Sequence, residues 1–334
     1  MILGSNSNTI NYYIEHPINN DKDYLEYTNS RFFNINEGEW YLDTTKYKNI
    51  YKLVANHYFD LAENKACRFW IEAPYIDYET SISRACQIMV NSLKALDKRN
   101  YYKFLALTAG YDSRVVYAAS YAANIDTKYF LSTMNTLKEN YPDLVIAGQI
   151  LKDDNKELMI VDDLDPLSED FIYYYQRNMD SSRIYPKTLT AQHMLNSPDF
   201  PDNTLVLTGN YSEIFKDYYR KREAASGAEI SKLVGIPKKY KVFDKPFDDW
   251  IDENRKLIKE SKINMMDLFF WEHRLPNFGV NYVANQDIAA EEFSVFNNRE
   301  LIMILIKAKY ANKTNHFQIF KDIIERFHPR LMTY

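Results

Sequence analysis

The residues with the clearest chemical potential lie between Thr108 and Ser113, where a short turn joins an apolar run to a helical pattern. A small-residue turn that enters a helix presents backbone N–H groups and the positive end of the helix dipole, which suit a phosphate. The hydroxyls of Thr108 and Ser113 are further donors. Asp112 would repel phosphates unless a cation intervened, so its expected role is to hold Mg²⁺. The alternative is an ordinary strand-to-helix turn.

Four apolar runs of strand length surround this turn in the sequence, at 101–107, 128–133, 157–161 and 203–208, with helical patterns at 111–124 and 141–151 between them. This alternation predicts an α/β fold with a doubly wound parallel sheet and helices on both faces. Ligands of such sheets bind beyond the carboxyl ends of the strands, where the turn would lie. After residue 209 the strand pattern ends, and the remainder predicts a helical C-terminal portion.

Residues 1–100 are expected to form an N-terminal lead-in segment with one packing helix. Its first 35 residues are polar and rich in Asn, whereas apolar residues from Ile82 to Leu96 recur at helical spacing. Residues 101–334 would then form the main domain.

Composition excludes several classes of function. The net charge of -5 and the pI near 5.8 give no general reason to bind nucleic acid or an anionic membrane. The first 20 residues do not resemble a secretory signal, and the aliphatic run Leu301–Ile306 is far too short to span a bilayer, so a cytoplasmic location is expected. Cys67 and Cys86 form no zinc or redox motif.

The segment FLALTAGYDSRVV, residues 104–116, resembles the pyrophosphate loop of the N-type ATP pyrophosphatases, whose usual form is Ser-Gly-Gly-x-Asp-Ser. It is most similar to the loop of asparagine synthetases and β-lactam synthetases, which implies an adenine nucleotide alpha hydrolase-like fold. Thr108 replaces Ser conservatively. Ala109 replaces the first Gly and requires a backbone that avoids positive φ.

A second segment, LVLTGNYSEIFKDYYR at 205–220, resembles the family signature Gly-x-Gly-x-Asp-Glu-x-Phe-x-x-Tyr. Glu213, Phe215 and Tyr218 match, and Ser212 stands where Asp is expected. The resemblance implies that Mg²⁺ is held by Asp112 and Glu213. The alternative for Glu213 is an acid in a first helical turn that favours the helix dipole.

The resemblance extends from about residue 30 to the end of the chain, with Phe296, Asn298 and Leu301 fitting a third, structural segment. The family also uses a C-terminal lysine, for which Lys307, Lys309 and Lys313 are candidates without a clear motif. The basic stretch 216–241 is expected to be a solvated loop, and closure over pyrophosphate is the alternative.

These matches together imply binding of ATP and Mg²⁺, with Asp112, Glu213 and Arg114 as catalytic residues. Arg114 would reach a phosphate or pair on the helix surface. The nucleotide would be bound by the loop, by the ends of neighbouring strands and by the glycine of the second segment: Leu107, Thr108, Ala109, Gly110, Tyr111, Asp112, Ser113, Leu131 and Gly209.

The implied reaction is adenylation of a small-molecule carboxylate with release of pyrophosphate, followed by amide formation with ammonia or an amine. Glutamine-dependent asparagine synthetases begin with a glutaminase whose nucleophile is an N-terminal cysteine. This chain begins Met-Ile, so a separate glutaminase subunit, free ammonia or a substrate amine is expected instead.

Two rivals remain open. One is another ATP-pyrophosphatase chemistry such as tRNA modification, which the absence of catalytic cysteines and of a basic surface disfavours. The other is a degenerate nucleotide-binding or scaffold protein, which Ala109 and Ser212 favour.

Overall fold

The structure is a computed structural model that describes residues 2–35, 40–72, 76–138, 140–179, 184–311 and 317–334. The chain divides into two units, each built from three separate stretches of sequence. The first unit consists of Met1–Glu72, Glu169–Ile184 and Asp217–Tyr282, and the second, which we call the sheet unit, consists of Ala73–Ser168, Tyr185–Lys216 and Val283–Tyr334.

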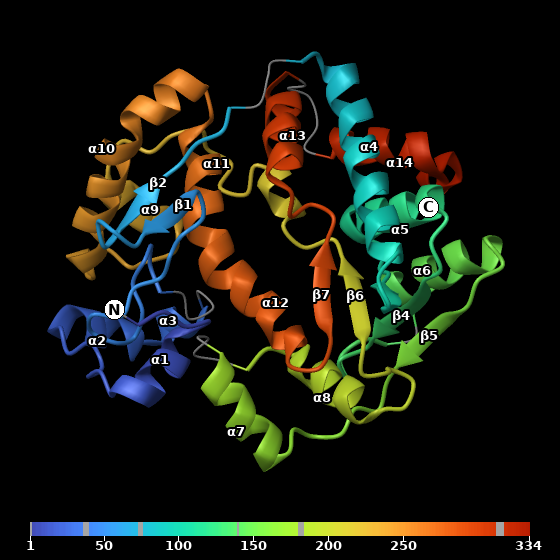
Figure 1. The fold of residues 1–334 in the computed structure, drawn as a ribbon, viewed down its shortest axis with the longest axis horizontal. Helices are drawn as coiled ribbons and strands as arrows, with labels where there is room; N and C mark the ends of the chain where they lie inside the picture. The colour runs from blue at the N-terminus through green and yellow to red at the C-terminus, as the bar shows by residue number, and fades with distance from the viewer. Residues whose placement is uncertain (1, 36–39, 73–75, 139, 180–183, 312–316) are drawn as a thin grey trace. The chain divides into compact units, whose positions relative to one another are not determined.

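The sheet unit contains a five-stranded parallel sheet in the order β5-β4-β3-β6-β7 (Figure 1). Its strands are β3 (Tyr102–Ala106), β4 (Lys128–Ser132), β5 (Leu158–Val161), β6 (Thr204–Thr208) and β7 (Glu291–Ser294). From β3 the chain adds β4 and β5 on one side, and it then returns to add β6 and β7 on the other. The strand order therefore switches direction between β3 and β6, where such sheets bind ligands.

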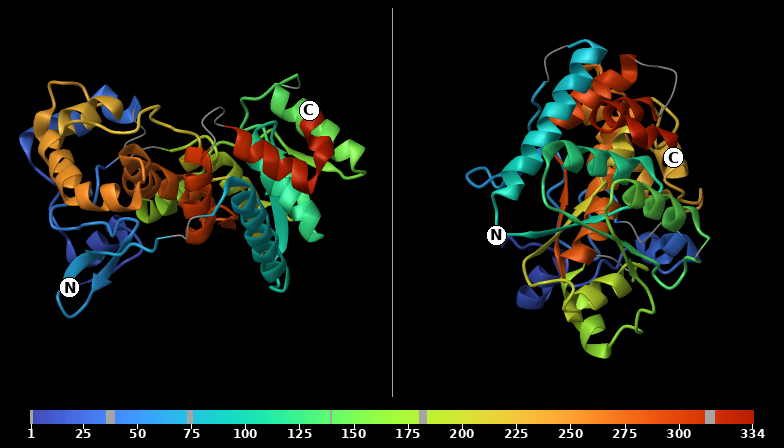
Figure 2. Two further views of the ribbon diagram at one scale, coloured as in Figure 1. Left: turned by 90° about the horizontal axis from the view of Figure 1, so that it is seen from above. Right: turned by 90° about the vertical axis from the view of Figure 1, so that its right-hand side faces the viewer.

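Helices cover both faces of this sheet, as the alternation of the β3 side chains requires. Phe104 packs in a buried cluster with Phe130 of β4 and Met194 of α8 (Thr188–Asn196), and Leu105, which follows it, faces the opposite side. On that side α5 (Tyr111–Ala123) contacts β3 and β6. The two helical layers can be followed in Figure 2, and the predicted doubly wound fold is confirmed.

Further helices complete the sheet unit, and two of them, α4 (Tyr78–Asp97) and α14 (Gln318–Phe327), contact α5. Residues Ile82, Met89 and Leu93 of α4 are completely buried, and Asp77 caps that helix by accepting a hydrogen bond from Thr80 N–H at 2.9 Å. The helices are α4 (Tyr78–Asp97), α6 (Pro142–Asp153), α13 (Arg299–Ala311) and α14 (Gln318–Phe327), with the short 3-10 helices η1 (Ser212–Phe215) and η4 (Pro329–Thr333).

Strand β7 corrects the expectation that the strand pattern ends after residue 209. It pairs with β6 in a segment whose sequence, EEFS, has no apolar alternation. Its Glu292 side chain is 1% exposed and forms an ion pair of 3.0 Å with Lys187. The sequence did not predict this strand, because a buried acid whose counter-ion lies far away in the sequence leaves no pattern in the neighbouring residues.

The first unit is mainly helical and aromatic. Its helices are α1 (Ser7–Ile14), α2 (Lys22–Thr28), α3 (Arg31–Ile35), α7 (Glu169–Asn178), α9 (Gly227–Leu233), η2 (Lys241–Phe243), α10 (Asp244–Ser261), α11 (Met265–Phe269) and the π-helical η3 (Phe270–Gly279). Strands β1 (His57–Asp60) and β2 (Lys65–Arg68) form an antiparallel hairpin, which no sequence pattern predicted. Helix α12 (Val280–Asp287) continues from η3 into the sheet unit.

Buried polar contacts hold the hairpin against η3. The carboxylate of Glu272 accepts hydrogen bonds from Asn56 and Trp250, and it forms an ion pair with Arg68.

The predicted lead-in segment is divided between the units: its residues up to Glu72 belong to the first unit, whereas α4 belongs to the sheet unit. The start of a separate catalytic domain at residue 101 stays a prediction.

Candidate functional site

The loop after β3 is a tight turn that delivers the chain into α5. Gly110 is the N-cap residue of α5, with φ -67° and ψ 150°, and no side chain caps the helix. Ala109 is not among the described residues with positive φ. The expectation that Ala109 avoids positive φ is therefore confirmed.

The hydroxyls of the loop bond to each other. Thr108 Oγ1 and Ser113 Oγ lie 2.9 Å apart, and Ser113 Oγ also accepts from Thr108 N–H at 3.1 Å. Gly110 N–H donates to Thr108 Oγ1 at 3.2 Å. These bonds close the turn, so the first role that the structure gives the two hydroxyls is to hold the shape of the loop.

A carboxylate already binds one amide of this loop. Ala109 N–H donates to Asp143 Oδ1 at 2.8 Å, from the first turn of α6. An amide N–H that donates to a carboxylate oxygen here can also donate to a phosphate oxygen. Sequence reasoning missed Asp143; its place in the first turn of a helix that follows a strand is the signal that could have found it.

The second predicted segment lies against this loop. At Gly209, which follows β6, an added Cβ would come within 2.6 Å of Asp112 Cβ and 2.9 Å of Asp112 O. Ser212 Oγ donates to Asp112 Oδ1 at 2.7 Å. Residues 100 positions apart in the sequence thus meet at the switch between β3 and β6.

A lysine links the two predicted acids. The Nζ atom of Lys216 lies 2.5 Å from Asp112 Oδ2 and 3.8 Å from Glu213 Oε1. It also lies 5.6 Å from the ring centre of Phe320 in α14. In the sequence Lys216 was one of several basic residues in a stretch expected to be a solvated loop, and the structure gives it this specific partner.

The pKa of Glu213 depends on burial and on the two charged neighbours Asp112 and Lys216. Burial raises the pKa of Glu213, and the charge of Asp112 raises it further, whereas Lys216 lowers it. Two carboxylates near one ammonium group form a place that attracts cations, and carboxylate oxygens are the ligands that Mg²⁺ prefers. The residues present therefore fit a magnesium ion.

The described residues contain no cluster of three or more His, Cys, Asp or Glu side chains that could hold a metal. This is compatible with Mg²⁺, which usually binds one or two carboxylates and completes its shell with phosphates and water.

The loop that follows β6 has a strained backbone, and hydrogen bonds to β7 hold it in place. Tyr211 has φ 72°, which is unusual for a bulky residue. Asn210 Nδ2 donates to Glu292 Oε1, and Ser294 Oγ donates to Asn210 O at 2.6 Å. Burial, with the nearby charge of Glu292, raises the pKa of Tyr211 to about 12. Strand β7 therefore fixes the loop that carries Glu213.

The side chain of Arg114 lies against η4 and Tyr334. It is buried under η4, where Nη1 donates to the carbonyl oxygens of Leu331 at 3.1 Å and Tyr334 at 3.3 Å. The guanidinium also lies 4.4 Å from the ring centre of Tyr111. These contacts correspond to neither of the expected alternatives and anchor the C-terminal 3-10 helix.

Other predicted residues are buried. Leu107 and Leu131 have exposed fractions of 0% and 3%, so their side chains belong to the core at the strand ends. Lys309 is buried in α13 and donates to Ile214 O at 3.3 Å, close to Glu213 in the chain. Lys313 lies outside the described residues.

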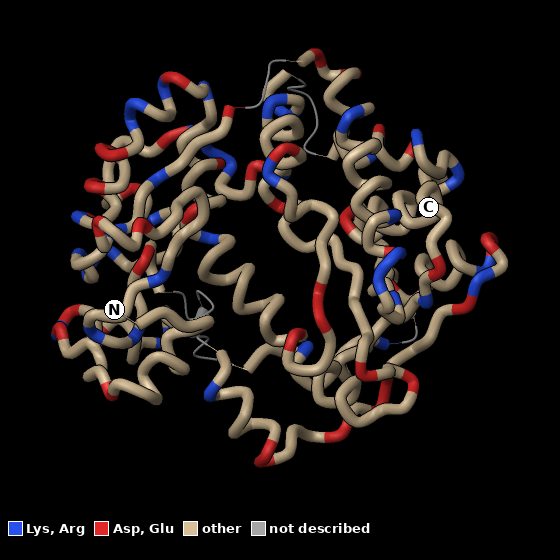
Figure 3. Tube along the Cα trace, in the orientation of Figure 1, with Lys and Arg blue, Asp and Glu red and all other residues tan. Residues whose placement is uncertain are grey.

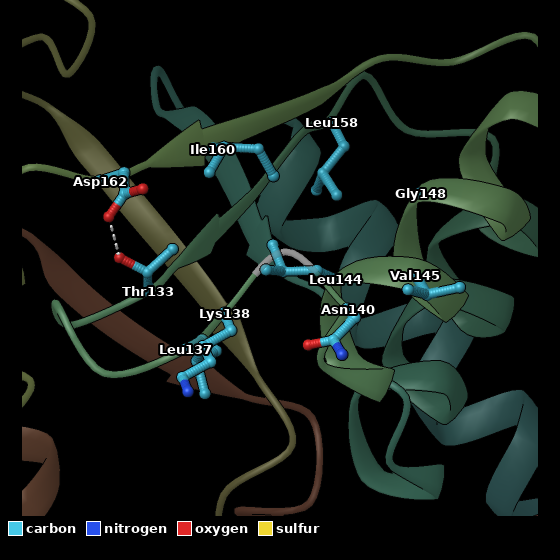
Figure 4. A pocket seen from close by; sticks show the side chains of 10 residues that line it. All are labelled: Thr133, Leu137, Lys138, Asn140, Leu144, Val145, Gly148, Leu158, Ile160 and Asp162. Carbon is cyan, nitrogen blue, oxygen red and sulfur yellow. Dashed lines mark hydrogen bonds between the residues drawn. The ribbon is translucent and has the colours of Figure 1, made fainter.

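An open pocket of 960 Å³ lies at the carboxyl ends of β4 and β5. Figure 4 shows Thr133 bonded to Asp162 at one end and apolar side chains of β5 and α6 around it, among them Ile160 and Leu144. Leu144 follows Asp143, which bonds the loop. The pocket and the loop therefore share the first turn of α6.

Basic and acidic residues are interspersed along the trace (Figure 3). Within the described residues, no helix is both long and apolar enough to cross a membrane.

Fold and site together define an α/β protein with a doubly wound parallel sheet, and at its switch point a turn leads into a helix whose N-terminus no side chain caps. No family model matches the chain. No match was found among curated proteins.

Solved structures similar to the chain include the NH3-dependent NAD synthetase from Campylobacter jejuni subsp. jejuni NCTC 11168 in complex with the nitrate ion. The sequence identity is 17%, the match covers 63% of this chain and 96% of that chain, and the TM-score is 0.30. Another is the NMN synthetase from Francisella tularensis, with 15% identity, coverage of 50% and 74%, and a TM-score of 0.29. At these TM-scores the likeness carries no argument about activity.

Proposed function

We propose that this chain is an ATP-dependent C–N ligase of the asparagine-synthetase-like type. It would convert ATP to AMP and pyrophosphate while adenylating a small-molecule carboxylate, and it would then form an amide with ammonia or an amine.

The observation that carries the proposal is the contact between the two predicted motifs. Gly209 packs on Asp112, and Ser212 donates to the carboxylate of Asp112 at 2.7 Å. The motifs follow β3 and β6, the strands between which the strand order switches. A ligand bound there could touch both loops at once.

The loop residues would bind the phosphates of ATP through the backbone. The first turn of α5 offers N–H groups that no side chain caps, starting at Tyr111. Thr108 and Ser113 would hold the turn in the shape that directs those groups at the β and γ phosphates. Asp143 would release Ala109 N–H when a phosphate oxygen takes its place.

Asp112 and Glu213 would hold Mg²⁺ from the side of the protein. When bound, this ion would supply charge neutralisation at the pyrophosphate leaving group. The protein then acts mainly by positioning, since the substrate carboxylate itself is the nucleophile at the α phosphate.

The pocket between β5 and α6 would receive the part of a ligand that extends beyond the phosphates. Its walls are apolar at Leu144 and Ile160, and Thr133 and Asp162 add polar groups. Ammonia could come from a separate glutaminase subunit or from solution, or the amine could belong to the substrate. A cytoplasmic location without nucleic acid or membrane partners remains part of the proposal.

A second candidate function is nucleotide binding without turnover. It is favoured by Lys216, whose ammonium group occupies the cation position, and by Asp143, which occupies a loop amide. A protein of this kind would bind ATP without cleaving it.

The test is pyrophosphate release from Mg-ATP, with AMP and ADP resolved, in the presence of ammonium and a panel of carboxylates. We expect AMP and pyrophosphate in equal amounts, and we expect Asp112→Asn to lower the rate by about two orders of magnitude or more, because it removes the charge that holds the metal. Asp202→Asn, at an exposed position beside the amino end of β6, is the matched control and should leave the rate unchanged.

Binding of ATP without release of AMP would select the second candidate. Release of ADP and phosphate in place of AMP would reject both the adenylation chemistry and its assignment to this loop.

A further inference from the structure

Lys216, like Asp143, is a residue of the site that sequence reasoning did not single out. It lies at the end of η1, three positions after Glu213, and its ammonium group forms a 2.5 Å ion pair with Asp112 across the gap between two loops. Its side chain is 21% exposed, so much of the ion pair is shielded from water. Such a pair is screened by salt far less than a surface pair.

The lysine occupies the position that a metal ion would use. Both carboxylates lie within 3.8 Å of its nitrogen, and the second oxygen of Asp112 accepts from Ser212. A divalent ion that ligates Asp112 Oδ2 must displace the ammonium group, because two cations cannot share this oxygen without strong repulsion. Binding of the metal is thus coupled to movement of Lys216.

We propose that Lys216 is an internal counter-ion that competes with a divalent metal ion for Asp112 and Glu213. This inference rests on the metal site of the proposed function. The long, flexible stem of lysine lets the ammonium group leave the carboxylates and bind a phosphate oxygen as a point charge. In the free protein Lys216 keeps the metal away, and a phosphate-bearing ligand draws Lys216 off and lets the metal enter with it.

A purely structural role makes a different prediction. If Lys216 only joined η1 to α5, its removal would lower the stability of the sheet unit and would leave metal affinity unchanged or weaker. The sign of the change in metal affinity therefore separates the two roles.

The experiment measures binding of Mn²⁺, as a probe for Mg²⁺, to the intact protein by electron paramagnetic resonance of the free ion. It uses the wild type and Lys216→Met, which keeps a long apolar stem beside Phe320. Titrations are run without and with inorganic pyrophosphate. Lys94→Met, at an exposed position of α4 in the same unit, is the matched control.

We expect Lys216→Met to bind Mn²⁺ alone about tenfold or more tightly than the wild type, within the range typical of coupled sites. Pyrophosphate should strengthen Mn²⁺ binding to the wild type by a similar factor and should do so much less in the variant. Asp112→Asn combined with Lys216→Met should lose the tight Mn²⁺ binding, which assigns it to this carboxylate.

Equal Mn²⁺ affinity of the wild type and Lys216→Met without pyrophosphate would overturn the inference. Lys216→Gln serves as the second variant if Lys216→Met does not fold. If the variant binds Mn²⁺ tightly but pyrophosphate changes nothing in the wild type, the competition between Lys216 and the metal stands. The release of Lys216 by a phosphate is then rejected, and with it the ATP site of the proposed function.

Discussion

Single residues of the site differ in whether the packing of the protein requires them, and the two glycines show this difference most clearly. Gly209 has to be glycine because the backbone and Cβ of Asp112 fill the space that a side chain would need. At Gly110 an added Cβ would meet Thr108 Oγ1 at an ordinary 3.4 Å, and φ is -67°. The packing of the protein therefore does not require glycine at Gly110, and the proposed function places a ligand in the space beside it.

Replacement of each glycine by serine tests this difference. Gly209→Ser should lower the free energy of unfolding by about 1–3 kcal/mol, because its Cβ overpacks against Asp112. Gly110→Ser should leave stability within a few tenths of a kcal/mol, because serine is a favoured N-cap residue. The measurement is urea unfolding of both variants beside the wild type.

Gly110→Ser should nevertheless weaken binding of Mg-ATP, since its side chain stands before the N-terminus of α5. Calorimetric titration with Mg-ATP checks this. Equal losses of stability in the two variants would show that packing requires glycine at Gly110 as well. An unchanged affinity for Mg-ATP in Gly110→Ser would show that the nucleotide does not bind beside Gly110.

Among the elements, η3 shows how a buried polar group can make stability depend on pH. The ring of His273 stacks between Tyr41 at 5.2 Å and Phe269 at 4.7 Å, and its Nδ1 accepts from Leu42 N–H at 3.2 Å. Burial, with a smaller effect from the charge of Lys52, lowers the pKa of His273 to about 3. The folded protein therefore keeps this histidine neutral well below neutral pH.

His273 should make the protein less stable in mild acid. Because its folded pKa lies below the unfolded value near 6.5, the unfolded chain takes up the proton first as pH falls. The contribution is complete above about pH 6.5 and is lost as pH falls towards 3; between pH 7 and pH 5 it amounts to about 2 kcal/mol. Urea unfolding at both pH values should show a smaller loss for His273→Gln than for the wild type. An equal loss in both proteins would contradict the prediction.

At the scale of the whole molecule, neither unit is a continuous piece of chain. The sheet unit takes α4 from before residue 100 and β7 from near the end. The first unit takes one stretch from before β3, one from between β5 and β6 and one from between β6 and β7. Residue 101, where the sequence pattern predicts a domain boundary, lies inside the sheet unit, between α4 and β3.

A fragment of residues 101–334 should fail to fold cooperatively. It lacks α4, whose Ile82, Met89 and Leu93 are completely buried. Each such side chain contributes about 1.5–3 kcal/mol, and a typical domain has only about 5–15 kcal/mol of stability in total. Urea unfolding followed by circular dichroism should give a broad transition or none. A sharp transition with the midpoint of the full chain would show that the boundary at residue 101 is a real domain boundary.

The sequence by itself determined the local framework of the sheet unit. The strand–turn–helix unit around Thr108, the alternation of strands and helices up to residue 208 and the absence of positive φ at Ala109 all follow from patterns that repeat over a few residues. Such patterns are visible because side-chain burial has a period of 2 in strands and 3.6 in helices.

Only the tertiary structure decided which distant groups meet. Lys216 donates to Asp112, which is 104 positions away in the sequence, and Lys187 donates to Glu292, which is 105 positions away. Arg114 donates to the carbonyl oxygen of Leu331, which is 217 positions away. Each contact depends on strand order and on the desolvation of a charge, and neither leaves a trace in the neighbouring sequence. For this reason the loop could be predicted from the chain alone, whereas the cation beside it and the strand that braces it could not.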